Sequence, residues 1–269
     1  MKQLVVNADD FGYTRDVNSG IIEAHRNGIL TATTLMANGQ AFDHAVELAS
    51  ENPNLDIGCH LVLVGGNSLL TNGHSLPRSL PEFLQRLALR QLDPYGELRA
   101  QVEKIIEAGI QPTHLDTHKH THLALPVLKA VARLSEEFGI RWVRRPFDYP
   151  LSGGDPVPWR KRVLSGGLQV LRSYFHRTLS RHGCRTTDYF AGFQLTGYLR
   201  TNELVALMRT LPDGLTEFMC HPGYCTDELR AAPTRLKKSR ERELQALTAP
   251  EVRATLRQIG IQLVRYRDL

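Results

Sequence analysis

Short apolar runs alternate with amphipathic stretches along most of this chain. The amphipathic stretches repeat apolar residues every three or four positions, as helices packed on one face do. The apolar runs between them are typical of parallel strands covered on both faces. Strands that alternate with helices at this spacing indicate βαβ units, and because no repeat or linker interrupts them we expect one α/β domain, 1–269. The predicted strands are 4–8, 30–36, 56–64, 140–143, 189–193, 214–220 and 262–266, and the predicted helices are 17–26, 41–49, 81–88, 96–108, 202–209, 239–247 and 250–259.

One segment, 146–186, breaks this rhythm. After an opening rich in proline and glycine, apolar residues recur at helical spacing from Trp159 to Leu179 with arginine and lysine between them. We predict an inserted helical segment or cap, kinked or split at Gly166-Gly167. Two interpretations stay open: a helix packed on the domain with a solvated basic face, or a cap or membrane-surface helix over 159–181 that handles an amphiphilic substrate.

The tract THLDTHKHTH, residues 113–122, carries an ionisable side chain at every second position. These are His114, Asp116, His118, His120 and His122. Residues two apart in a strand point to the same face, so we expect four imidazoles and a carboxylate on one face. A helix is expected to begin at Pro126, so the tract lies where a strand gives way to a helix, the place at which α/β proteins bind ligands. On this tract alone, a run of solvated histidines remains an alternative.

Other predicted strands also end in polar groups. Asp9 and Asp10 follow the first strand, His60 lies in the third, and His221 follows the strand that contains Glu217. Adjacent carboxylates repel, so they favour a bound cation or a proton-transfer task. In a barrel these strand ends meet on one rim.

One carboxylate and two neutral imidazoles with open positions are typical of a catalytic metal site. Mixed nitrogen and oxygen donors suit zinc and also admit manganese, nickel or magnesium. A second carboxylate can then act as base and a histidine across the site as acid. A phosphoesterase or cyclic amidohydrolase could use the same groups, but phosphate favours several cations at the rim, where only Arg144 and Arg145 are candidates. A histidine-rich metal-handling protein has no use for Asp9 or His221.

Composition excludes several classes of protein. A net charge of +5 and a pI near 9.1 are too mild to indicate nucleic-acid binding. No apolar run of about 18 uncharged residues predicts a membrane span, and the amino-terminal run is too short for a signal peptide, so we expect a cytoplasmic protein. The four cysteines form no CxxC pair and are expected to be free thiols.

Six motifs occur in the order found in a known family. They are VNADDFG (6–12), GILTATTLMANG (28–39), IGCHLVL (57–63), PTHLDTHKHTH (112–122), TEFMCHPGY (216–224) and YRDL (266–269). With them the chain resembles the YdjC-like carbohydrate deacetylases, which include chitooligosaccharide deacetylases and hopanoid-associated proteins.

This resemblance implies a distorted, TIM-barrel-like (β/α) barrel and metal-dependent removal of an N-acetyl group from an amino sugar. It implies one divalent metal, zinc or magnesium, bound by Asp10, His60 and His118. It further implies that Asp9 is the general base and that His221 is the acid for the leaving amine. Further residues are expected around the metal or on the substrate side: Asp116, His120, His122, Glu217, Arg144 and Arg145.

Within the family, the chain is most similar to the hopanoid-associated branch. The signs are HLVLVGG after His60, the sequence RRP at 144–146, and the basic segment. The expected substrate is then an N-acetylglucosaminyl lipid, with a chitooligosaccharide as the alternative. We also expect peripheral contact of 159–181 with the inner face of the membrane, and a homodimer.

Overall fold

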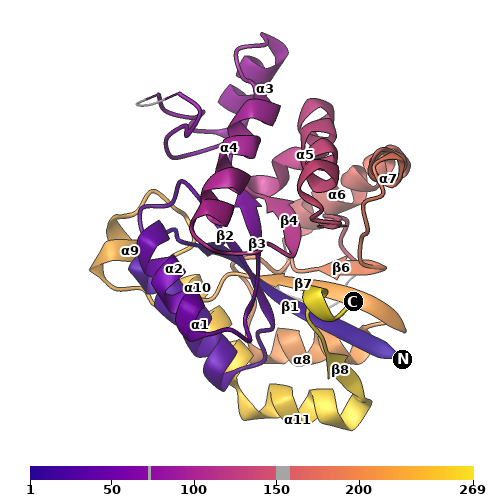
Figure 1. Cartoon of the computed structure of the whole chain (residues 1–269). Coiled ribbons are helices and arrows are strands. Elements are labelled where there is room, and N and C mark those ends of the chain that lie inside the picture. The colour runs from indigo at the N-terminus through magenta and orange to yellow at the C-terminus, as the bar shows by residue number, and fades with distance from the viewer. Residues whose placement is uncertain (72–73, 150–157) are drawn as a thin grey trace.

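Seven parallel strands form one continuous sheet in the computed structural model, which describes residues 1–71, 74–149 and 158–269. The strand order is β5-β4-β3-β2-β1-β7-β6, so the first strand lies near the middle (Figure 1). This parallel α/β arrangement confirms the fold class expected from the sequence. The strands are β1 (Lys2–Phe11), β2 (Ala32–Leu35), β3 (Asp56–Leu61), β4 (His114–Thr117), β5 (Trp142–Val143), β6 (Tyr189–Ala191) and β7 (Gly214–Cys220).

The sheet curls, so that its two edge strands β5 and β6 approach each other. They are joined by isolated parallel bridges, Trp142 to Arg185 and Asp148 to Phe190. The amide of Val143 donates to the carbonyl of Arg185 at 2.9 Å, and the amide of Arg185 donates to that of Arg141 at 2.7 Å. We call this junction the seam. The distorted barrel is therefore a curled sheet whose edges meet at isolated bridges instead of along a full ladder.

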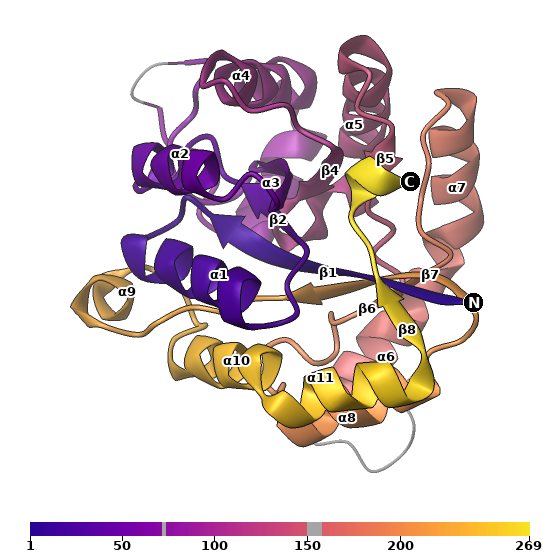
Figure 2. The same ribbon diagram turned by 60° about the horizontal axis from the view of Figure 1, so that its bottom comes forward.

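The carboxyl terminus closes the amino-terminal end of the strands. A last strand, β8 (Ile261–Leu263), pairs with the first residues of β1 (Figure 2). The 3₁₀ turn η3 (Tyr266–Asp268) then places Tyr266 in a small apolar cluster with Val5, Trp142 and Leu215. The rest of the hydrophobic core lies between the sheet and the surrounding helices.

The helices cover the outer face of the curled sheet (Figure 1). In α5, Pro126 occupies the first turn, apolar residues at helical spacing are buried, and Gly139 ends the helix at φ 69°. Among the described residues, no helix is long and apolar enough to cross a bilayer. The helices are α1 (Arg15–Asn27), α2 (Phe42–Glu51), α3 (Leu80–Ala88), α4 (Pro94–Glu107), α5 (Leu125–Phe138), α6 (Trp159–Leu168), α7 (Arg172–Arg181), α8 (Thr201–Thr210), α9 (Asp227–Ala231), α10 (Lys238–Thr248) and α11 (Pro250–Ile259).

The segment with the basic amphipathic pattern forms two helices. α6 and α7 are separated by the short turn η2 (Gln169–Leu171), just after the glycine pair that the sequence marked as a break. Residues 150–157, which contain the proline- and glycine-rich opening, lie outside the described residues. That 146–186 is an insertion stays a prediction.

Candidate active site

Two neighbouring carboxylates, Asp9 and Asp10, lie inside β1 and not after it. Adjacent strand residues normally point to opposite faces, yet both of these side chains reach the same pocket. The pairing of β1 with β2 contains one extra residue between Ala8 and Phe11, and Asp10 adopts φ 72°. This β-bulge turns the second carboxylate back to the pocket side. Asp tolerates positive φ better than most residues, which fits its place at the turn.

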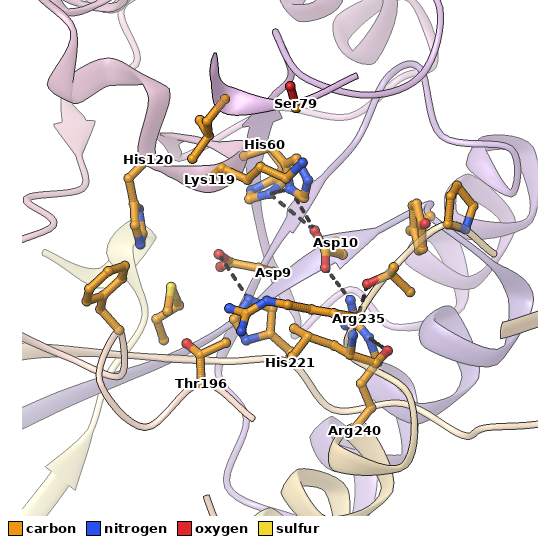
Figure 3. A pocket seen from close by; sticks show the side chains of 18 of the residues that line it. Asp9, Asp10, His60, Ser79, Lys119, His120, Thr196, His221, Arg235 and Arg240 are labelled. Atoms are coloured by element: carbon orange, nitrogen blue, oxygen red, sulfur yellow. Dashed lines mark hydrogen bonds and ion pairs between the residues drawn. The ribbon is translucent and has the colours of Figure 1, made fainter. Parts of the chain in front are cut away.

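Three donor atoms from separate parts of the chain form a small triangle. Asp10 Oδ1 lies 3.3 Å from His60 Nε2 and 3.2 Å from His118 Nδ1, and the two imidazole nitrogens are 3.2 Å apart (Figure 3). When two ligand atoms each lie about 2.0–2.1 Å from the same divalent metal, the distance between the two ligand atoms is about 2.9–3.4 Å. Asp10 Oδ1 is also buried without a hydrogen-bond donor. The residues present therefore fit one divalent cation.

His60 is held in position from behind. Its Nδ1 lies 2.7 Å from Asp116 Oδ1, and the Thr34 hydroxyl donates to Asp116 Oδ2 at 3.1 Å. A carboxylate on the far nitrogen fixes the tautomer of a ligand histidine and leaves Nε2 as the donor atom. Burial alone would lower the pKa of His60, but Asp116 and the other nearby carboxylates raise it to about 10. This local excess of negative charge favours a bound cation.

Arg144, which follows β5, links the carboxylates from inside the barrel. Its guanidinium is buried and donates to both oxygens of Asp9, at 2.6 and 2.7 Å, and to Glu217 at 2.7 Å. It also forms an ion pair with Asp116 at 2.6 Å. Burial opposes ionisation of Asp9, but Arg144 and the nearby imidazoles together lower its pKa. Asp9 is thus an oriented carboxylate that stays ionised at neutral pH.

A second buried arginine, Arg240 of α10, pairs with the other oxygen of Asp10 (Figure 3). Against the effect of burial, Arg240 and the two imidazoles of the triangle hold the pKa of Asp10 well below its usual range. Nothing in the sequence motifs indicated Arg240, which lies far along the chain in a helix of mixed charge. Its position is visible only once α10 is packed beside β1.

His221, at the end of β7, lies across the pocket from the triangle. Its Nε2 is 3.9 Å from Asp9 Oδ2, and its backbone amide donates to Glu243 Oε2 at 2.6 Å. Burial lowers the pKa of His221 to about 4, although Asp9 and Asp10 act in the opposite direction. Burial also raises the pKa of Glu243 to about 6. The sequence indicated His221 but gave no sign of Glu243.

A cavity of about 680 Å³ is lined by Asp9, Asp10, His60, His118, His221 and Arg240. Its lining also includes apolar residues, among them Leu80, Pro81, Leu164, Phe193 and Leu236. Four further cations line it, namely Arg78, Lys119, Lys161 and Arg235, and none of them forms an ion pair with a described residue. The sequence had offered only Arg144 and Arg145 as rim cations, so the structure corrects that expectation.

The chain matches the family of YdjC-like proteins over residues 3–258. It belongs to that family. Relatives named carbohydrate deacetylase are 35% identical in Brevibacillus brevis, covering 99% of both chains, and 32% identical in Clostridium beijerinckii, covering 99% of this chain and all of the relative. A crystal structure from Enterococcus faecalis, described as a cellobiose-phosphate cleavage protein, is 26% identical with a TM-score of 0.78 and covers 99% of this chain and 98% of that one. The resemblance noted from the motifs is confirmed.

The motifs of this YdjC-like chain have distinct structural tasks. In VNADDFG, Gly12 has φ 90°. Its carbonyl oxygen packs against Gly39 so closely that a Cβ atom at position 39 would lie only 2.1 Å from it, which leaves room for glycine alone. The terminal YRDL is structural: Tyr266 stacks on His114 with ring centroids 4.2 Å apart, and Arg267 pairs with Asp56 at 2.8 Å.

The histidine tract does not form one alternating face, so that prediction was wrong. β4 ends at Thr117, the 3₁₀ turn η1 (His118–Leu123) follows, and Lys119 and His120 adopt positive φ. The imidazoles therefore diverge, and His118 is the tract's only member of the triangle.

The remaining predicted residues occupy three kinds of position. His120 lines the cavity beside Phe193, with ring centroids 5.5 Å apart. His122 is buried against the Arg144 carbonyl at 3.1 Å, and Glu217 supports Arg144 without lining the cavity. Arg145 lies outside the site, where its guanidinium contacts the carbonyls of Thr187 and Asp188.

Proposed function

We propose that this protein is a metal-dependent hydrolase that removes the N-acetyl group from an N-acetylglucosamine-containing substrate. The observation that carries the proposal is the triangle of Asp10, His60 and His118 beside an oriented, ionised Asp9. The two relatives named carbohydrate deacetylase support the amide of an acetylated sugar as the target bond. They favour this reaction over a phosphoesterase or cyclic amidohydrolase, and over a histidine-rich protein that only handles metal.

The expected metal would be held by Asp10, His60 and His118, and two imidazoles with one carboxylate suit zinc better than magnesium. When bound, such a cation supplies Lewis-acid polarisation of a carbonyl and activation of water. The acetyl group would enter the cavity with its carbonyl carbon near Asp9. Arg144 fixes the Asp9 carboxylate, so that it is positioned to accept a proton as water attacks.

Cleavage of the amide also requires a proton on the leaving nitrogen. His221 Nε2 lies 3.9 Å from Asp9 Oδ2, so the proton taken from water can reach that nitrogen by way of the imidazole. The oxygen of water joins the acetyl carbon, the carbon–nitrogen bond breaks, and acetate and a free amine result. His221 rests neutral because burial lowers its pKa, so it can accept this proton before passing it on.

As the specific substrate, we propose a glycolipid with an N-acetylglucosaminyl head group. The support is the apolar part of the cavity lining, which includes Leu80, Leu164 and Leu236; of these, Leu80 and Leu164 are 42% and 53% exposed. A sugar alone does not need this apolar area, whereas a lipid attached to the sugar would cover it. A chitooligosaccharide remains the soluble alternative.

The cations at the cavity favour a second candidate, an acetylated amino sugar that carries an anionic group. Burial lowers the pKa of Lys119 and of Lys161, the latter to about 8, and the nearby positive charge of Arg235 acts in the same direction on both. Cations gathered without a paired acid attract an anion. A phosphorylated sugar therefore belongs in any substrate panel.

The deciding experiment measures acetate release after chelation, with zinc, magnesium or manganese returned. The substrates are N-acetylglucosamine, diacetylchitobiose, its phosphate ester and an alkyl N-acetylglucosaminide. Asp9→Asn should lower kcat by about 100-fold or more while the bound metal per chain is unchanged. The exposed Asp43→Asn, which removes a carboxylate from α2, is the matched control and should keep full activity.

Release from none of these substrates, with or without metal, would contradict the proposed reaction. Equal activity of Asp9→Asn and wild type would contradict only the proposed role of Asp9 as the base and would leave the proposed reaction standing. Metal-restored release confined to the alkyl glycoside would support the glycolipid, and preference for the phosphate ester would support the anionic sugar.

A further inference from the structure

The outer face of α6 and α7 exposes large apolar side chains where solvated helices usually carry polar ones. Trp159, Val163, Val170 and Tyr174 are 68%, 64%, 84% and 41% exposed. Their spacing of four, seven and four residues places them on one side of the nearly continuous helical segment. We call these four residues the outer stripe. Scattered exposed apolar residues are ordinary, but a row of this kind marks a contact surface.

The opposite side of the same segment already has its partners. Ser165, Phe175 and Leu179 are buried, and Lys161 Nζ donates to the carbonyls of Gln194 and Thr196 at 3.3 and 2.6 Å. The helices are thus fixed to the barrel through their inner side. The outer stripe stays exposed, and the two helices that carry it lie at the periphery of the molecule (Figures 1 and 2).

Within α6 and α7 themselves the charges have one sign. No aspartate or glutamate occurs from residue 159 to 181, and the exposed cations in that range are Arg160, Arg172, Arg177 and Arg181. Apolar residues with tryptophan and tyrosine, flanked by arginine, match the interface of a bilayer that contains anionic lipids. The same charges would repel a second copy of this chain placed face to face, which disfavours the stripe as a self-association surface.

We propose that the outer stripe docks the protein on an anionic lipid surface. Trp159, Val163, Val170 and Tyr174 enter the interface. The exposed arginines nearest to them on the segment, Arg160, Arg177 and Arg181, lie at the level of the lipid phosphates. Leu164, the residue after Val163, is 53% exposed and also lines the cavity. Docking would therefore bring the mouth of the cavity to the membrane, where a lipid-linked sugar could enter while its apolar part stays in the bilayer.

Vesicle flotation tests this proposal without any turnover. The metal-chelated full-length protein is mixed with vesicles of phosphatidylcholine alone or of phosphatidylcholine with phosphatidylglycerol, at low and high salt. We expect binding to the anionic vesicles that weakens as salt rises. Because Trp142 is buried and Trp159 exposed, a blue shift of tryptophan emission should report entry of Trp159 into the bilayer.

Two variants make the test specific. Val163→Asp and Val170→Asp each remove one apolar contact and should weaken vesicle binding by about tenfold apiece. Both positions are largely exposed, so the fold and the turnover of soluble substrates should be unchanged. Leu89→Asp is the matched control, because Leu89 is 59% exposed at the end of α3 and lies outside the stripe.

Three outcomes would overturn the proposal: binding to neither vesicle, equal binding by the stripe variants and wild type, or a wild-type dimer that the stripe variants convert to monomer. The last result would assign the stripe to a protein partner. Since binding is measured on chelated protein without substrate, its failure is separate from failure of the deacetylase reaction.

Discussion

Arg144 shows how one buried side chain can organise several others. Burying a guanidinium costs several kcal/mol unless carboxylates and hydrogen bonds compensate. Here the compensation comes from Asp9 on β1, Asp116 on β4 and Glu217 on β7, so a single group connects three strands. The planar fork holds both oxygens of Asp9, which a lysine could not do.

The contact between Asp116 and His60 gives a prediction at this scale. Asp116→Asn keeps the shape of the side chain but loses the charge that orients the imidazole. We expect metal affinity to fall by about 10- to 100-fold. Because Asp116 also pairs with the buried Arg144, the free energy of unfolding should fall as well. Competition with a chromogenic chelator measures the affinity, and Asp43→Asn is the control. Unchanged affinity would show that Asp116 does not position the ligand.

The site could be predicted from sequence only in part. Asp9, Asp10, His60, His118 and His221 could be singled out because each lies near the carboxyl end of a strand and in a recognisable motif. Arg240 and Glu243 could not. Both come from α10, whose pattern is ordinary, and they reach the site only because the barrel packs α10 close to β1 and β7.

At the scale of single elements, the histidine tract and β1 differ from their predicted side-chain alternation because their backbones do not stay regularly extended. An alternating sequence predicts a strand face only while the backbone stays extended, and it does not report where the strand ends. In the histidine tract the ending at Thr117 and the positive φ of Lys119 and His120 redirect the side chains. In β1 the bulge at Asp10 had the opposite effect and brought together two side chains that alternation would separate.

Asp148, between β5 and the basic segment, carries a prediction about pH. It accepts from the amides of Phe193 and Gln194 at 3.1 and 2.7 Å, yet burial raises its pKa from 3.8 to about 7. Between those values the folded protein retains a proton that the unfolded chain has released. The stability from this group is therefore full at low pH and is lost as pH rises through about 7.

This effect is isolated by the unfolding free energy of wild type minus that of Asp148→Asn. As pH rises from 4 to 7, this difference should fall by up to about 1.4 kcal/mol per pH unit, and above pH 7 it should level off. Urea denaturation of the chelated proteins at several pH values measures it. A flat difference over this range would show that Asp148 titrates as it does in the unfolded chain.

At the scale of the whole molecule, the chain's last residues complete its first strand. Tyr266 is buried under the barrel, between His114 and Trp142. Tyr266→Ala should lower the free energy of unfolding by about 3 kcal/mol or more, as loss of a large buried aromatic does. Leu263→Ala, at a partly exposed position of β8, is the control and should change it by less than about 1 kcal/mol. Equal losses would contradict a closing role for Tyr266.

The alternation of strands and helices was predictable over nearly the whole chain, because each element has a clear apolar pattern. The short helix α9 was not, since five residues are too few to show a period. The way the sheet closes was also hidden. A pattern gives the order of elements along the chain but not how many hydrogen bonds join the first edge to the last.

The seam between β5 and β6 has a consequence for motion. A full ladder protects its amides from solvent, whereas isolated bridges can open locally at small free-energy cost. The amides of Val143, Tyr149 and Arg185 should therefore exchange with deuterium faster than those of β1, in the absence of substrate. Equal protection would show that the seam is as stable as the ladder.

Arg144 immediately follows Val143, so each opening of the seam would loosen one side of the backbone that carries the side chain holding Asp9. Faster deuterium exchange at these amides would then indicate a smaller fraction of molecules in which Asp9 is held in place for catalysis. A substrate that fills the cavity would slow both the opening and the exchange.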